Sequence, residues 1–134
     1  MYIDFLYNVF NDYRSNNAII WNGKIYKYSS LVEYIENACN FIDSSGIKPG
    51  TVVALDGDFT PKSIALLLAL IEKACIVVPL TNVVTKNEKK LFHIAQVELV
   101  FRIDKDDDFT SESFSRRYEN KYYELIRKKC HPGL

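Results

Sequence analysis

The 134-residue sequence predicts an α/β fold, namely a layered, mainly parallel sheet with flanking helices, preceded by an N-terminal helix and a β-hairpin. From residue 51 onward, three short apolar runs with strand character alternate with segments of helical spacing, which indicates right-handed β-α-β units. Before residue 51, a segment of helical spacing precedes two apolar runs joined by Asn22-Gly23. The sequence does not specify the order of the strands.

The first element is an amphipathic helix, because apolar residues recur at helical spacing near the start of the chain. These residues are Ile3, Leu6, Val9, Phe10 and Tyr13. Residues 18–21 and 24–28 are then two strands of a hairpin, since Asn22-Gly23 tolerates the positive φ angles of a tight turn.

A second helix is predicted within residues 29–46, with one apolar face formed by Leu31, Ile35, Ala38, Cys39 and Ile42. Ser30 and Glu33 have the spacing of a capping box at its start, and Gly46 is a natural stop. The segment Lys48-Pro49-Gly50 then turns the chain into a strand at residues 51–55.

The most apolar stretch is IALLLALIEKACIVVPL, at residues 64–80. A membrane span needs about 20 apolar residues. Here the uncharged part ends before Glu72-Lys73, and Pro79 would break a single helix. We therefore expect a buried helix, capped by Thr60-Pro61 and exposed at its Glu72-Lys73 end, followed by a central strand that closes at Pro79.

The remaining chain continues the alternation. Thr85 and Glu88 form a second capping box that opens a helix through residues 89–96, and residues 98–103 are a third strand. The acidic, serine-rich residues 104–115 are predicted to be a loop. A last helix, ended by Pro132-Gly133, is indicated by Tyr118, Tyr122, Leu125, Ile126 and Lys129. No repeat or linker divides residues 1–134.

The composition argues against several functional classes. Lys plus Arg and Asp plus Glu both number 17, so no basic excess favours nucleic acid or anionic lipid as a partner. The start of the chain lacks a basic head followed by an apolar run, which argues against a signal peptide. Cys39, Cys75 and Cys130 are odd in number and far apart, as expected of a reduced, cytoplasmic protein in which cysteine fills the core.

Asp56-Gly57-Asp58-Phe59-Thr60, at the end of a predicted strand, resembles the aspartate motif of haloacid-dehalogenase-type phosphatases. In that family the first aspartate attacks the phosphate, the second is an acid/base, and magnesium binds both, which would assign these roles to Asp56 and Asp58. The helix expected directly after Thr60 leaves no room for the insert that this fold requires. The alternative interpretation is a turn followed by a helix cap.

The sequence gives little support to other kinds of catalytic, phosphate-binding or metal-binding site. There is no glycine-rich phosphate loop, His93 and His131 have no partners at ligand spacing, and no Ser-His-Asp set is indicated. The run Asp104-Lys105-Asp106-Asp107-Asp108 is most simply a solvated loop, with a weak cation site as the alternative. We assign no catalytic, cofactor-binding or metal-binding residue.

Residues from about 18 to 81 contain two short motifs. These motifs and the segments around them resemble, in the same order, the start of the adenylate-forming enzymes. That family contains AMP-binding acyl- and aryl-CoA synthetases, fatty-acid AMP ligases and peptide-synthetase adenylation domains. Its first core motif is matched by Tyr28, Ser29 and Leu31. Its second is matched by Leu70, Lys73, Ala74, Pro79 and Leu80, with Cys75 where glycine is usual. Residues 46–55 between the motifs are also typical, although Asp58 stands where asparagine is common.

The resemblance implies the N-terminal subdomain of a longer ligase that uses ATP and Mg²⁺ to form an acyl-adenylate and passes the acyl group to a thiol of CoA or a carrier protein. The last residues, His131-Pro132-Gly133-Leu134, resemble those just before the family's phosphate-binding loop. That loop and the family's other catalytic segments map to no residue of this sequence. The resemblance therefore implies a structural fragment that is inactive alone and has the rest of the enzyme as its partner.

Two other hypotheses remain open beside the ligase fragment. One is a small phosphatase that uses Asp56 and Asp58. The other is a non-enzymatic α/β interaction module. Because a severed subdomain would expose apolar surface that its neighbour covers, we also expect the chain to associate with itself.

Overall fold

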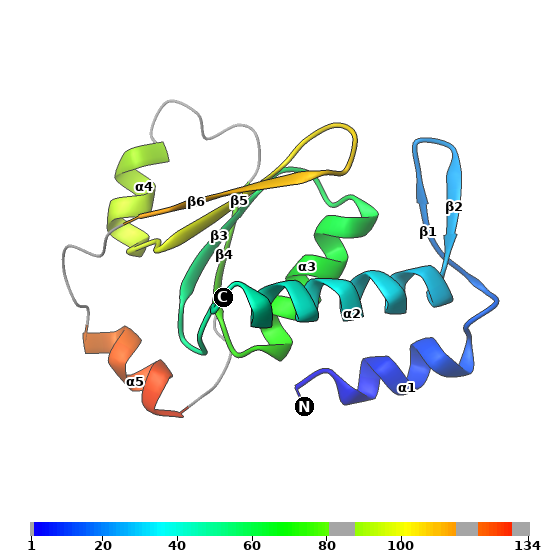
Figure 1. Cartoon of the computed structure of the whole chain (residues 1–134), viewed down its shortest axis with the longest axis horizontal. Helices are drawn as coiled ribbons and strands as arrows, with labels where there is room; N and C mark the ends of the chain where they lie inside the picture. Colours follow the sequence, from blue (N-terminus) through cyan, green and yellow to red (C-terminus); the bar gives the residue numbers. More distant parts are fainter. Residues whose placement is uncertain (1, 81–87, 115–120, 130–134) are drawn as a thin grey trace.

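The computed structural model describes residues 2–80, 88–114 and 121–129, which form helices packed on a four-stranded sheet, with a separate hairpin (Figure 1). The elements are α1 (Asp4–Asp12), β1 (Asn17–Trp21), β2 (Lys24–Lys27), α2 (Tyr28–Ser44), β3 (Val52–Asp56), α3 (Pro61–Glu72), β4 (Ile76–Leu80), α4 (Glu88–Ala95), β5 (Leu99–Ile103), β6 (Phe109–Ser113) and α5 (Lys121–Lys129). The predicted fold class is confirmed.

The main sheet has the order β4-β3-β5-β6. Strand β3 pairs in parallel with both β4 and β5, as the alternating pattern predicts. Strand β6 pairs antiparallel with β5, so the prediction of a loop over residues 104–115 is confirmed for 104–108 and was wrong for 109–113. The reason is that Phe109 places an aromatic ring in the core, with its centroid 5.3 Å from that of Phe41 and 5.5 Å from that of Phe101, while most of β6 is a polar edge.

Strand β4 lies at an edge of this sheet in the described part of the chain, so the prediction of a central strand was wrong. The amide of Ile76 donates to the carbonyl of Thr51, and the amide of Gly57 donates to the carbonyl of Leu80. Backbone groups alternate in direction along a strand, so Val77 and Pro79 direct theirs away from β3. Pro79 therefore removes no hydrogen bond from the β3–β4 ladder.

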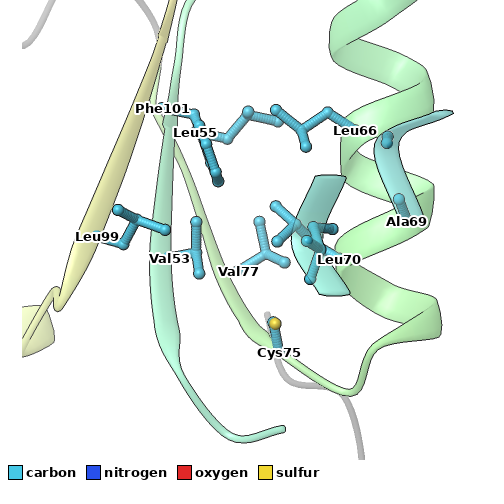
Figure 2. Packing of buried hydrophobic residues seen from close by; sticks show 11 residues of the cluster. Val53, Leu55, Leu66, Ala69, Leu70, Cys75, Val77, Leu99 and Phe101 are labelled. Atoms are coloured by element: carbon cyan, nitrogen blue, oxygen red, sulfur yellow. The ribbon is translucent and has the colours of Figure 1, made fainter. Parts of the chain in front are cut away.

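Both faces of the sheet are covered. Val53, Leu55 and Val77 point toward α3, where Leu66 and Leu70 meet them (Figure 2). The alternate residues of the strands pack on the opposite face together with residues of α4 and α5, namely Val52, Ala54, Ile76, Phe92, Val100, Tyr123 and Ile126. Burial on two faces explains why the strands are continuously apolar rather than alternating.

A third cluster of apolar side chains holds α1 and the hairpin against α2 and α3, and includes Ile3, Leu31, Ile35 and Ala65. The predicted hairpin turn is confirmed, with φ of 49° at Asn22 and 75° at Gly23. The carboxylate of Glu72 accepts from the amides of Tyr2 at 2.9 Å and Ile3 at 3.1 Å. Glu72 is thus half-buried and caps α1, whereas an exposed position was predicted.

Three helices end in the same way. After α2, the amide of Gly46 donates to the carbonyl of Asp43 and that of Ile47 to the carbonyl of Ile42. This is the Schellman pattern, in which one residue adopts positive φ. The equivalent residues after α3 and α4 are Ala74, with φ of 55°, and Gln96, with φ of 53°. Gly46, with φ of 69°, confirms the predicted stop.

The predicted capping box at Ser30 and Glu33 was wrong, because α2 begins at Tyr28 and Lys27 precedes it without a side-chain cap. By contrast, Thr60 caps α3 as predicted, since its hydroxyl accepts from the amide of Ser63 at 3.2 Å and Pro61 follows. Other predicted features lie outside the described residues, namely Thr85, Tyr118 and Pro132-Gly133.

The apolar residues 64–80 form parts of α3 and β4, which confirms the prediction of a helix followed by a strand. Among the described residues, no helix combines the length and the apolar character that a bilayer span requires.

Candidate functional site

The carboxyl edge of the parallel strands is the first place to seek a site, because open α/β sheets bind ligands there. At this edge, the end of β3 lies beside the β5–β6 turn. Arg102 of β5 places one guanidinium nitrogen 2.7 Å from the carboxylate of Asp56, and the other lies 3.7 Å from Glu112 of β6. The charge of Asp56 is thus balanced by a cation from the adjacent strand.

The structure does not bring Asp56 and Asp58 into a joint site. The side chain of Asp58 is exposed, and its carbonyl accepts from the hydroxyl of Ser63 at 2.7 Å and from the amide of Thr60 at 2.9 Å. Asp58 therefore helps to start α3 through its backbone. Helix α3 begins at Pro61, so the insert of a haloacid-dehalogenase-type phosphatase does not follow the motif.

The structure gives Asp107 a role that the sequence pattern did not predict. Only 5% of its surface is exposed, and its carboxylate accepts from the hydroxyl of Thr60 and from the amide of Lys62, at 3.1 and 3.2 Å. A carboxylate at a helix N-terminus satisfies free amides and opposes the positive end of the helix dipole. Asp107 is thus a second cap for α3, supplied by a distant turn.

The rest of the acidic run shapes and anchors that turn. The carboxylate of Asp104 accepts from the amides of Asp106 at 2.9 Å and Asp108 at 3.0 Å, and Asp107 has a φ of 65°. Asp108 lies 2.7 Å from the ammonium of Lys62, which raises the pKa of that lysine through the hydrogen bond. The prediction of a solvated loop is thus confirmed for most of the run but was wrong for Asp107, which is buried. No group of three His, Cys, Asp or Glu side chains in the described residues has the arrangement of a metal site.

The cysteines and the described histidine occupy separate places. Cys75 is fully buried, and burial raises the pKa of its thiol to about 11. Burial also raises the pKa of the half-buried Cys39. His93 is exposed on α4, which agrees with its interpretation as an ordinary helix residue, while Cys130 and His131 lie outside the described residues.

The residues of the two family-like motifs make structural contacts. Tyr28 stacks on Phe10 with 5.1 Å between ring centroids, and Leu31 is buried below the hairpin. Lys73 pairs with Asp43 at 2.6 Å. Ala74, rather than Cys75, holds the positive φ after α3, so cysteine at the usual glycine position causes no backbone strain there.

Comparisons with known proteins bear on the fold. No family model and no curated protein matches the sequence. Among solved structures, VinN has a TM-score of 0.71 at 15% identity, with coverage of 80% of this chain and 29% of VinN. The NpsA N-terminal subdomain of Klebsiella oxytoca has a TM-score of 0.70 at 18% identity, with coverage of 98% of this chain and 34% of that chain.

NpsA-ThdA, an artificially fused adenylation-PCP di-domain of Klebsiella oxytoca, has a TM-score of 0.71 at 15% identity, with coverage of 95% of this chain and 23% of that one. The chain has the fold of part of an adenylation-domain N-terminal subdomain, which confirms at the level of the fold the resemblance predicted from the motifs. It spans about a third or less of the length of these chains.

Proposed function

We propose that this chain is the N-terminal part of an ATP-dependent carboxylate-adenylating ligase, in which it acts as scaffold rather than as catalyst. The main support is that the two ordered motifs occur in a chain whose fold matches the NpsA N-terminal subdomain over 98% of its length. The proposed parent enzyme forms an acyl-adenylate with ATP and Mg²⁺ and transfers the acyl group to the thiol of CoA or a carrier protein.

The contacts of the motif residues support a scaffold role. Leu31, Leu70 and Ala74 are buried, and Tyr28 and Lys73 are engaged with neighbouring helices. At the carboxyl edge, Asp56 is likewise paired with Arg102, and Asp107 is used as a helix cap. The ATP-binding and carboxylate-activating groups of the proposed parent enzyme would come from other segments.

The proposal is tested by carboxylate-dependent ATP–pyrophosphate exchange. We expect no exchange by the 134-residue chain with a panel of fatty, aryl and amino acids. We expect exchange by a protein in which the native reading frame continues past Leu134, with a Ser/Thr/Gly-rich loop ending in Pro-Lys. Exchange by this chain alone would contradict the scaffold role, and a continuing frame without such a loop would contradict the parent activity.

The phosphatase hypothesis receives no support from the geometry of Asp56 and Asp58, and a separate assay distinguishes it. Hydrolysis of p-nitrophenyl phosphate is measured with and without Mg²⁺ for the wild type and for Asp56→Asn. Magnesium-dependent turnover that Asp56→Asn abolishes would favour the phosphatase, whereas equal background rates agree with the scaffold role.

A further inference from the structure

Helices α4 and α5 present positive charge on the outside of the molecule. Together they contain five lysines and one arginine against two glutamates. The side chains of Tyr122 and Leu125 are 63% and 55% exposed in the same layer. We call the exposed side chains of this layer the basic surface, which is defined by Lys89, Lys90, Tyr122, Leu125, Lys128 and Lys129.

The two helices contact each other and pack on the same face of the sheet. The hydroxyl of Tyr123 donates to the carbonyl of Ala95 at 2.8 Å, which joins α5 to the end of α4. Arg127 anchors the inner face of α5, because it donates to the carbonyl of Gly50 at 2.9 Å and to the carboxylate of Glu98 at 3.0 Å. Tyr122, Leu125, Lys128 and Lys129 are therefore held outward on α5, whose inner face is anchored.

Negative charge gathers at the opposite end of the sheet. Residues 104–112 contain five carboxylates and one lysine. Asp107 is buried, Asp108 pairs with Lys62, and Glu112 lies 3.7 Å from Arg102, so the carboxylates still outnumber the cations around this turn. The contact between Asp107 and Thr60 ties this turn to the β3–α3 loop, where Asp58 is exposed and Phe59 is 60% exposed. We call this region the acidic surface, which is defined by Asp58, Phe59, Asp104, Asp106, Asp108 and Glu112.

The formal net charge of the chain is zero, so these two surfaces are opposite charges separated within one molecule. Figure 1 shows α5 and the β5–β6 turn at opposite ends of the sheet. Tyr122 and Leu125 on the basic surface and Phe59 on the acidic surface are exposed apolar side chains with charged neighbours, as in the centre and rim of an interface. Neither surface can pair with itself without opposing like charges, but each complements the other.

We propose that copies of this chain associate head to tail, with the basic surface of one copy on the acidic surface of the next. This proposal goes beyond the ligase function and does not depend on it. An interface between two different surfaces leaves a free basic surface at one end and a free acidic surface at the other. Association therefore continues past the dimer as the protein concentration rises.

The wild type tests the proposal first, by sedimentation equilibrium over a range of concentrations. The screening length falls from about 10 Å at about 0.1 M salt to about 3 Å at about 1 M. We expect a mass that increases with concentration at low salt and a dissociation constant at least about tenfold higher at high salt. A strict monomer at low salt and high concentration would overturn the proposal.

Complementary charge reversal then tests which surfaces meet. Lys128→Glu/Lys129→Glu removes the positive excess of the basic surface, and Asp58→Lys/Asp106→Lys removes most of the negative excess of the acidic surface. All four side chains are exposed, so we expect both pairs of substitutions to leave the fold intact. We expect each variant alone to be monomeric, since one of its surfaces has lost the charge that complements the other. We expect an equimolar mixture to associate through the unaltered acidic surface of one variant and the unaltered basic surface of the other.

A matched control variant changes the charge elsewhere on the molecule. Lys24→Glu/Lys27→Glu makes the same change of charge on the hairpin, and we expect it to associate like the wild type. Circular dichroism checks that each variant is folded. Association of either reversed variant alone at wild-type strength would overturn the proposal, as would a mixture that stays monomeric. A monomeric wild type that binds vesicles of anionic lipid would assign the basic surface to a membrane instead.

Discussion

Asp107 stabilises α3 from a turn 47 residues further along the chain, through its contacts with the Thr60 hydroxyl and the Lys62 amide. We expect Asp107→Ala to lower the free energy of unfolding by about 2–3 kcal/mol, because one buried and one partly buried donor lose their acceptor. Urea denaturation measures the change. Asp106→Ala is the control, since this neighbour is exposed, and it should change stability by less than about 0.5 kcal/mol. Equal effects of the two changes would contradict a capping role.

The thiols of Cys39 and Cys75 should react at very different rates. The thiolate is the reactive form, and a pKa of about 11 leaves about a thousandth of Cys75 as thiolate at pH 8. In a Cys130→Ser background, we expect iodoacetamide to modify the half-buried Cys39 well before the fully buried Cys75. Mass spectrometry of the digested protein follows both sites, and the difference should disappear in denaturant. Equal rates in the native protein would contradict burial of Cys75.

At the scale of residues, the sequence predicts what depends on near neighbours. Thr60-Pro61 identifies the start of α3, and Asn22-Gly23 identifies the hairpin turn. Asp107 could not be singled out, because nothing in a run of five charged residues distinguishes the one that folds back onto a distant helix. The sequence also did not predict the pairing of Asp56 with Arg102, because this pairing depends on the register of β3 and β5.

At the scale of elements, Gly57 decides how closely the end of β3 approaches β5. Its φ is 148°, and an added Cβ would lie 2.9 Å from Cβ of Ile103 and 3.0 Å from its carbonyl oxygen. We expect Gly57→Ala to lower the free energy of unfolding by about 2–4 kcal/mol, because it combines backbone strain with a clash between strands.

Gly46→Ala is the matched control for that substitution. Gly46 also has positive φ, but no atom lies within 4 Å of its added Cβ. Only the strain of the helix end should then appear, at about 1 kcal/mol, when the two variants are compared by urea denaturation. A loss at Gly57 no larger than the loss at Gly46 would show that the contact with Ile103 relaxes.

The boundaries of elements show why prediction succeeds at some ends and fails at others. Gly46 predicts the end of α2. Ala74 and Gln96 adopt positive φ after α3 and α4 although neither residue is glycine. Ser30 and Glu33 have capping-box spacing, yet α2 starts earlier, so the local motif did not decide the boundary. Strand β6 was missed because only Phe109 among its residues carries the apolar signal of a buried strand.

At the scale of the whole molecule, two of the three clusters of apolar side chains share a residue rather than being separate. Cys39 packs against both the cluster between the sheet and α3 and the cluster that holds α1 and the hairpin. Helices α2 and α3 contribute to both clusters. We therefore expect the described part of the chain to unfold as one cooperative unit.

Trp21 makes that expectation measurable. It is the only tryptophan of the sequence and lies in β1, away from the main sheet, so its fluorescence reports on the hairpin. Far-UV circular dichroism reports on all helices and strands. The two probes should give the same urea midpoint, and an earlier fluorescence transition would show that the hairpin and α1 unfold independently.

The parallel arrangement of β3, β4 and β5 follows from the alternation of short apolar runs with helices, which is a property of the sequence pattern. The strand order does not follow from it, because a run buried on both faces has the same composition at the edge and in the centre of a sheet. The composition did not reveal the opposite charges of the basic and acidic surfaces, because the formal net charge of the chain is zero.

The outward-directed position of Pro79 has a consequence for solubility. An exposed strand edge is a template on which another strand can add, and repeated addition leads to amyloid-like stacking. Among the described residues, Val77 also directs its amide and carbonyl away from β3 but is fully buried, whereas Pro79 is exposed and offers no donor at this edge. An incoming strand would therefore be left with an unsatisfied carbonyl after a few residues. Pro79 thus hinders the addition of further strands to β4 and leaves the hydrogen bonds between β3 and β4 intact.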